Sequence, residues 1–211
     1  MGANSFGLTM KIAIICGSQR QNSQTRKVGG TLQQLLETRG VASYLLDLAT
    51  LELPHFDDSF WKQPDGALQQ QWQPIGDQLS ECEALIVIAP DWHGMAPSVL
   101  KNFFLYCGTS EVANKPGLLI GVSVSSGGHL PVTELRISSA KNNRICWIPD
   151  HLIVRNVKQC LNSAEASEFK DDLYIHARVK HSLDLLTEYA NALQLVRDSG
   201  VADYKTYPYG M

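Results

Sequence analysis

Several signatures of common enzyme classes are missing from this chain of 211 residues. No C-x-x-C pair occurs among its five scattered cysteines, which argues against a zinc ribbon or a thioredoxin-type redox pair. Neither G-x-G-x-x-G nor G-x-x-x-x-G-K-[ST] is present, so a Rossmann dinucleotide site and a P-loop are disfavoured. G-x-S-x-G and H-E-x-x-H are absent too, which disfavours a serine hydrolase and a zinc peptidase, and we expect no metal site.

The chain also has no large excess of positive or negative charge and no long hydrophobic run. The net charge of −3 creates no strong basic field, so we expect no nucleic-acid or membrane partner. No apolar run approaches the roughly 20 residues that cross a bilayer, and the N-terminus has no signal-peptide pattern. An odd number of scattered cysteines suits reduced thiols. These features favour a cytoplasmic protein.

The composition is that of a globular protein with a substantial core. Hydrophobic residues make up 44% of the chain and charged residues 18%. We expect one domain over residues 10–200, a loose leader at residues 1–9 and a C-terminal tail at residues 201–211. No internal repeat or low-complexity linker divides the domain.

Strand-like and helix-like segments alternate along the domain, which predicts an α/β fold. Strands are expected at residues 11–16, 41–48, 84–89, 118–124 and 144–148, with a further extended stretch at 151–157. Helices are expected at residues 24–38, 67–80, 98–107, 130–142 and 164–196. The uninterrupted apolar run at residues 85–88 is typical of a strand covered on both faces. The pattern predicts a three-layer α/β/α sandwich around a five-stranded parallel sheet.

The first predicted strand leads directly into a hydroxyl-rich loop and then a helix. The side chains offered there belong to Ser18, Arg20, Asn22, Ser23, Gln24 and Thr25. A helix start adds free N–H groups and the positive end of its dipole, which together favour an anion. Flavodoxin-like proteins hold the FMN phosphate in such a loop. An ordinary capped helix start has a similar composition, so the loop alone leaves both interpretations open.

Two further loops follow the third and fourth predicted strands, at the same edge of the sheet. The second loop contains Pro90, Asp91, Trp92, His93, Gly94 and Met95, and the third loop contains Ser125, Ser126, Gly127 and Gly128. A flavin ring needs an apolar wall and backbone hydrogen-bond partners. Trp92 and Met95 are candidates for the wall, the backbone of residues 91–94 for the polar edge, and His93 for a group that modulates the flavin. Each feature alone also has an ordinary structural explanation, but all three loops share one edge.

The motifs G-S-x-R-x-x-S at residues 17–23 and P-D-W-H-G-x-x-P-x-V-L-K-N at residues 90–102 resemble the NADPH-dependent FMN reductase family. The resemblance covers about residues 11–153 and implies a flavodoxin-like fold. It implies that residues 18, 20, 23 and 25 bind the FMN phosphate and that residues 90–95 and 125–128 line the flavin. The chain departs from the family's P-E-Y-N and following P-G at Asp91, Trp92, His93 and Ser98.

By this resemblance the protein is an FMN-dependent NAD(P)H oxidoreductase. It would pass hydride from NADPH or NADH through bound FMN to a quinone-like, flavin, azo or metal-oxyanion acceptor. A non-enzymatic FMN-binding electron carrier or sensing module is the alternative, and a fold member that has lost its flavin is another. The family also implies a homodimer or homotetramer, for which residues 54–66, with Phe56, Phe60 and Trp61, are a candidate interface or lid.

Overall fold

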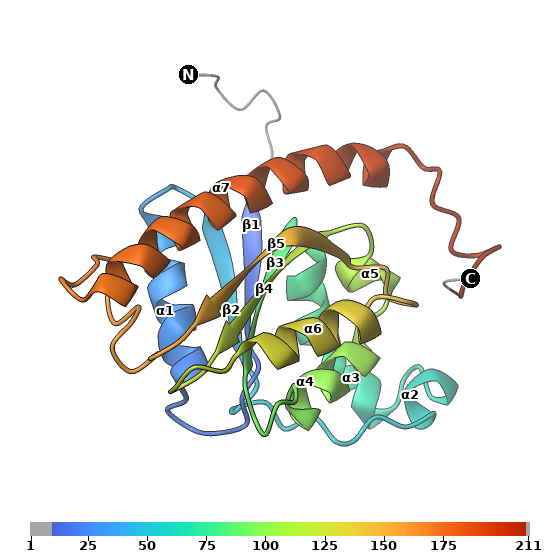
Figure 1. The fold of residues 1–211 in the computed structure, drawn as a ribbon. Helices are drawn as coiled ribbons and strands as arrows, with labels where there is room; N and C mark the ends of the chain where they lie inside the picture. Colours follow the sequence, from blue (N-terminus) through green and yellow to red (C-terminus); the bar gives the residue numbers. More distant parts are fainter. Residues whose placement is uncertain (1–9, 210–211) are drawn as a thin grey trace.

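The computed structural model describes residues 10–209, so the expected leader at residues 1–9 lies outside the described residues. Five parallel strands form one sheet in the order β2-β1-β3-β4-β5 (Figure 1). They are β1 (Lys11–Cys16), β2 (Ala42–Asp47), β3 (Ala84–Pro90), β4 (Pro116–Val122) and β5 (Cys146–Val154). The predicted five-stranded parallel α/β fold is confirmed, and the strand order is that of flavodoxin-like proteins.

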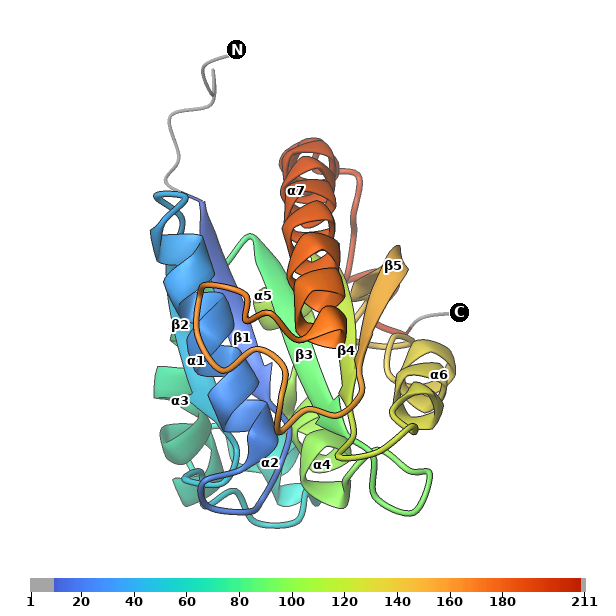
Figure 2. The same cartoon turned by 60° about the vertical axis from the view of Figure 1, so that its left-hand side comes forward.

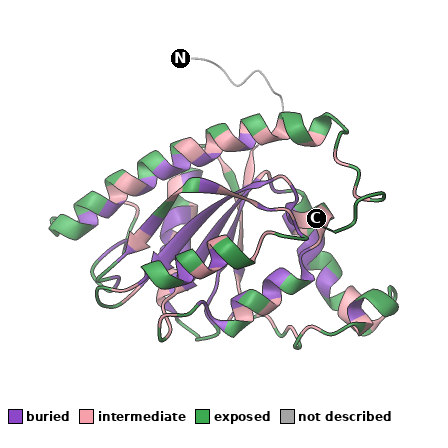
Figure 3. Ribbon diagram, turned by 45° about the vertical axis from the view of Figure 1, so that its right-hand side comes forward, coloured by how far each residue is buried: buried purple, intermediate pink, exposed green. Residues whose placement is uncertain are grey.

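Helices cover both faces of the sheet (Figure 2). One face carries α1 (Gln24–Glu37) and α7 (Lys170–Asp198). The other carries α3 (Ala67–Ser80), α4 (Ser98–Tyr106) and α6 (His129–Ser138), with the short helices α2 (Ser59–Lys62) and α5 (Thr109–Val112) beside them. The three central strands, β1, β3 and β4, are almost entirely buried between the two layers (Figure 3).

The apolar run in β3 supplies both hydrophobic cores. Ile86 and Ile88 pack under α1 and α7, whereas Leu85 and Val87 pack under α3 and α4. Successive side chains of a strand point to opposite faces, so a strand covered on both sides must be apolar throughout. This explains why the run lacks polar alternation.

Several predicted element boundaries were wrong. β4 covers Pro116–Val122 rather than residues 118–124, and α6 ends at Ser138 rather than at residue 142. The stretches expected at 144–148 and 151–157 form one strand, β5, whose pairing with β4 shifts register opposite Gly117 and Leu119. Pro149 lies in the shifted segment and has no N–H to donate to the ladder. The last helix begins at Lys170 rather than 164, because the preceding residues form a long connection from β5. The short helices α2 and α5 were not predicted.

The described part of the expected tail folds back onto the domain. The guanidinium of Arg144 lies 4.5 Å from the centre of the Tyr204 ring, and its Nη2 donates to the Tyr207 carbonyl at 2.6 Å. The Asn114 side chain donates to the Tyr204 hydroxyl. Asn114 and Arg144 precede β4 and β5, so the tail packs at the amino ends of these strands, away from the three candidate loops.

The five cysteines are all free thiols, and four of them are buried. Burial raises the pKa of Cys16 to about 12 and that of Cys82 to about 11. Since the thiolate is the reactive form, we expect these thiols to resist alkylation in the native protein up to about pH 9. Cys146 is the partly exposed one and should react first. Native thiol titration of the protein and of Cys146→Ser checks this, with all thiols expected to react in denaturant.

No helix within residues 10–209 is long and apolar enough to span a membrane, although α7 has 29 residues.

Candidate functional site

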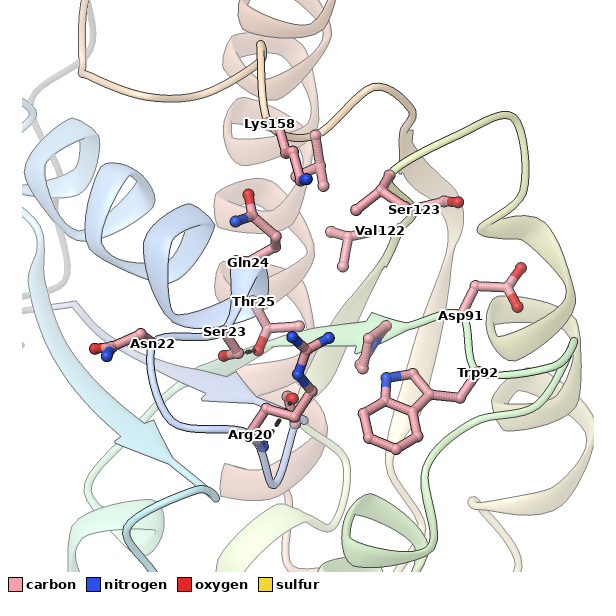
Figure 4. A pocket seen from close by; sticks show the side chains of 14 residues that line it. Arg20, Asn22, Ser23, Gln24, Thr25, Asp91, Trp92, Val122, Ser123 and Lys158 are labelled. Atoms are coloured by element: carbon pink, nitrogen blue, oxygen red, sulfur yellow. Dashed lines mark hydrogen bonds between the residues drawn. The ribbon is translucent and has the colours of Figure 1, made fainter.

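A pocket of about 360 Å³ opens at the carboxyl ends of β1, β3 and β4 (Figure 4). Its lining consists of Ser18, Arg20, Asn22, Ser23, Gln24, Thr25, Pro90, Asp91, Trp92, Val122, Ser123, Val124, Val157 and Lys158. The chain leaves β1 towards β2 on one side, and β3 lies on the other. Ligands of doubly wound folds bind at this kind of switch point, and the volume is within the usual range for small-molecule sites.

The hydroxyl-rich loop forms one wall of the pocket. Ser23 is the N-cap of α1 and accepts a hydrogen bond from the Arg26 N–H at 3.1 Å. Its oxygen also lies 2.8 Å from Thr25 Oγ1, while Ser18 Oγ accepts from the Arg20 N–H at 3.2 Å. One bond between Ser23 and Thr25 uses one of their two hydroxyl protons, which leaves the other for a ligand. The same residues therefore cap α1 and line the pocket.

Gly17 brings this loop close to β3. Its N–H donates to the Ile88 carbonyl at 2.9 Å, and a Cβ placed on it would lie 2.8 Å from that same oxygen. Only glycine fits so close to a neighbouring backbone.

The Gln24 side chain is a candidate contact for a hydrogen-bonding ligand. Its Oε1 atom is buried and has no hydrogen-bond partner within the described chain. An unsatisfied buried acceptor costs roughly 1–3 kcal/mol, so such atoms are rare without a function. Gln24 also lines the pocket (Figure 4), and a rotation of its amide group would bring this oxygen to a hydroxyl group of a ligand.

Asp91 joins the two other candidate loops. Its Oδ1 accepts from the Gly94 N–H at 2.8 Å, and its Oδ2 accepts from the Gly128 N–H at 2.7 Å. Trp92 and Met95 exchange backbone hydrogen bonds around a tight turn. Both central residues of that turn, His93 and Gly94, have positive φ angles of 54° and 76°, as a type I′ turn requires. A single carboxylate thus sets the position of both loops.

The pocket brings together nine of the candidate residues: Ser18, Arg20, Asn22, Ser23, Gln24, Thr25, Pro90, Asp91 and Trp92. The remaining ones lie beside it rather than in its lining, namely His93, Gly94, Met95, Ser125, Ser126, Gly127 and Gly128. Met95 is 53% exposed, on the turn next to the pocket. Three of the four N–H groups at residues 91–94 already donate within the protein, and the fourth, that of His93, has no partner in the described part of the chain.

Sequence analysis missed the part of the lining that follows β4 and β5. Val122, Ser123 and Val124 come from the end of β4, and Val157 and Lys158 come from the connection after β5. Ser123 was assigned to the interior of the fourth strand, expected at residues 118–124, whereas β4 ends at Val122 and Ser123 follows it. No local pattern marks Lys158, because its place depends on how the connection folds.

The V-L-K-N part of the second motif, at the start of α4, supports the loop of residues 90–97. Lys101 of α4 pairs with Glu134 of α6 at 2.8 Å, and the other Glu134 oxygen accepts from the Ala96 N–H at 2.7 Å. Partial burial opposes ionisation of Glu134, but the hydrogen bonds from Lys101 and Ala96 outweigh it and lower the pKa of Glu134. The loop of residues 90–97 is therefore attached to both α4 and α6.

Asn102 holds the segment that was a candidate interface or lid. Its side chain accepts from the Phe56 N–H at 2.8 Å and donates to the Pro54 carbonyl at 2.7 Å. The rings of Phe56 and Phe60 pack edge-on against Tyr106 of the same chain. Trp61, at 68% exposure, is the aromatic side chain of this segment that faces solvent.

No group of three or more His, Cys, Asp or Glu side chains within the described ranges is arranged to hold a metal ion.

Comparison with known proteins agrees with this geometry. The sequence profile of the NADPH-dependent FMN reductase family matches residues 10–159. The chain belongs to this family. As a family member it is an FMN-dependent NAD(P)H oxidoreductase, and the resemblance stated from its motifs is confirmed.

Relatives of this reductase carry names of the same kind. The FMN-dependent NADPH-azoreductase of Staphylococcus aureus is 27% identical over 128 residues, which cover 61% of this chain and 68% of that protein. Among solved structures, the flavoenzyme FerB, an NAD(P)H:(acceptor) oxidoreductase from Paracoccus denitrificans, superposes with a TM-score of 0.66 at 20% identity. That match covers 87% of the reductase described here and 98% of FerB. An oxidoreductase from Corynebacterium diphtheriae has a TM-score of 0.62 at 15% identity, covering 89% and 98% of the two chains.

Proposed function

We propose that the pocket at the carboxyl ends of β1, β3 and β4 is the FMN site of this reductase. The hydroxyl-rich loop and the N-terminus of α1 would hold the phosphate, with Arg20 as a cation beside it. Gln24 Oε1 would accept from a ribityl hydroxyl, and Trp92 would form an apolar wall for the ring. The single observation that carries the proposal is that the hydroxyl-rich loop and the N-terminus of α1, together called the anion cradle, line one pocket with Trp92.

Bound FMN would supply hydride transfer between a nicotinamide nucleotide and an acceptor. The chain's own residues bind and orient. Asp91 fixes the two loops that flank the ring position through the Gly94 and Gly128 N–H groups. Trp92 and the half-exposed Met95 provide an apolar surface at the pocket mouth, where donor and acceptor would stack in turn. The His93 N–H lacks a partner in the described part of the chain. It would contact the polar edge of the ring and so modulate the reduction potential of the flavin.

We further propose an aromatic, electron-poor small molecule as the acceptor, such as a quinone or an azo compound. The name of the Staphylococcus aureus relative supports an azo substrate, and a flat apolar surface at Trp92 and Met95 suits planar acceptors.

We propose a homodimer or homotetramer, with the solvent-facing Trp61 as a candidate contact, and a cytoplasmic location that suits the free thiols. Sedimentation velocity of the purified protein tests the assembly, and a strict monomer would contradict it.

The experiment that tests the function is an anaerobic titration of the FMN-loaded protein. We expect one FMN per chain after reconstitution, and bleaching of its visible absorption by NADPH or NADH. Reoxidation by a quinone or an azo dye should then restore the spectrum. Dithionite is the control for a reducible flavin. A protein that dithionite bleaches but neither nicotinamide nucleotide does would be a carrier or sensor, and one that takes up no FMN would contradict the site.

A further inference from the structure

The connection from β5 to α7 is long and crosses one face of the molecule. Residues 155–169, here called the strap, leave the carboxyl end of β5, cross over α1 and return to the start of α7 (Figure 2). Val157, Cys160 and Leu161 of the strap are buried. The strap is thus a packed part of the domain that lies over the helix whose N-terminus forms the anion cradle.

Hydrogen bonds from α1 hold the strap in place. The Lys27 ammonium donates to the carbonyls of Val157 and Cys160, at 2.6 Å for Cys160, and to the Asn162 side chain at 2.8 Å. Thr31 Oγ1 donates to the Leu161 carbonyl at 2.8 Å. On the β4 side, the Val157 N–H donates to the Ser123 carbonyl at 3.1 Å. The backbone next to residue 158 is therefore fixed from two sides.

Lys158 points from this fixed backbone towards the pocket. Figure 4 shows its side chain directed from the strap towards the space between Gln24 and Val122, and it belongs to the pocket lining. Its ammonium has no hydrogen-bond or ion-pair partner among residues 10–209, and neither has the guanidinium of Arg20 in the same lining. By contrast, the ammonium groups of Lys27 and Lys101 are both engaged by protein oxygens.

The charge of the pocket lining is unbalanced without a ligand. Arg20 and Lys158 are its cations, and Asp91 is the single acidic residue of the lining. Both Asp91 oxygens already accept from backbone N–H groups, so this carboxylate does not neutralise either cation. The α1 N-terminus adds further positive potential. Two unpaired cations at a helix N-terminus suit a ligand with a dianionic phosphate end.

We propose that Lys158 is a specificity residue that recognises the phosphate end of the flavin and so selects FMN over riboflavin. The inference rests on the proposed FMN site. Arg20 would approach the phosphate from the hydroxyl-rich loop and Lys158 from the strap. Because α1 and the third loop both hold the strap, cofactor binding would also connect these three segments through one anion.

Flavin affinities of the apoprotein test the proposal. We expect Lys158→Gln to weaken FMN binding about tenfold, as for loss of one charge-assisted contact, and to change riboflavin binding less than about twofold. Lys158→Arg should retain most of the FMN affinity. The dependence of FMN affinity on salt should become shallower in Lys158→Gln. Fluorescence titration with FMN and with riboflavin at several salt concentrations measures all three quantities.

The matched control is Lys180→Gln, which removes the same charge from an exposed position on α7 and should leave both affinities unchanged. Equal weakening of FMN and riboflavin by Lys158→Gln would place the residue at the ring or ribityl chain and overturn the proposal. An unchanged FMN affinity would overturn it as well. In both of those outcomes wild-type protein still binds FMN, whereas failure of the wild type to bind FMN contradicts the proposed site itself.

Discussion

Gly121→Ala is expected to destabilise the protein by about 3 kcal/mol or more and to reduce its affinity for FMN. Gly121 lies in β4, where the third loop crosses it closely. A Cβ on this residue would lie 1.8 Å from the Gly128 carbonyl oxygen and 2.8 Å from its carbonyl carbon. Both are backbone atoms, so no side-chain rotation relieves the clash. Either the strand or the loop must move, and the loop carries the Gly128 N–H that Asp91 accepts.

Gly30→Ala is the matched control for this substitution. Gly30 lies within α1, and the atom nearest to a methyl group at this position would be the flexible end of Arg26, at 3.2 Å. Replacing a mid-helix glycine by alanine should stabilise the protein by up to about 1 kcal/mol. Urea unfolding of the two variants and the wild type, compared at equal m-values, gives the difference. A free energy of unfolding for Gly121→Ala within about 1 kcal/mol of the wild-type value would be close to the error of two extrapolations. It would show that the loop can move away from the new methyl group at little cost.

Asp91→Asn is expected to cost about 2 kcal/mol of stability and about tenfold in FMN affinity. The aspartate carboxylate accepts two backbone N–H groups, one from the turn at Gly94 and one from the third loop at Gly128. An asparagine of the same shape has one oxygen and one NH₂ group, so it can accept from only one of them and presents a donor to the other. One of the two loops must therefore lose its attachment.

The control for the charge change is Asp65→Asn, at an exposed turn before α3. It should leave stability and FMN affinity at wild-type values. Thermal unfolding and fluorescence titration of both variants separate the effect of the hydrogen bonds from that of net charge. If Asp91→Asn matched Asp65→Asn in both measurements, the two loops would be held by other contacts and the role assigned to Asp91 would be wrong.

The part of the site nearest to β1 was accessible from the sequence for a local reason. Ser18, Ser23 and Thr25 lie within a few residues of the strand and helix ends that position them. One short segment of sequence therefore shows both which side chains are present and where they lie. The same holds for Trp92, which follows β3 directly. Short-range signals of this kind specify an element end without knowledge of the rest of the fold.

The contacts of Asp91 illustrate what such signals omit. Its partner Gly128 is 37 residues away, and the pairing exists only because β3 and β4 are neighbours in the sheet. The sequence placed His93, Met95 and the third loop at the flavin. They lie beside the pocket rather than in its lining, and their contact with the flavin stays a prediction.

The amino-acid sequence by itself determined the α/β class, the hydroxyl-rich loop after β1, the family and its cofactor chemistry. Each of these depends on patterns within one or two adjacent elements. Only the tertiary structure decided that Lys158 lines the pocket, that Asp91 joins two loops, and where α7 begins. The strap is held by Lys27 and Thr31, which precede it by about 130 residues. Contacts over such separations arise from the packing of the whole domain, and no local pattern encodes them.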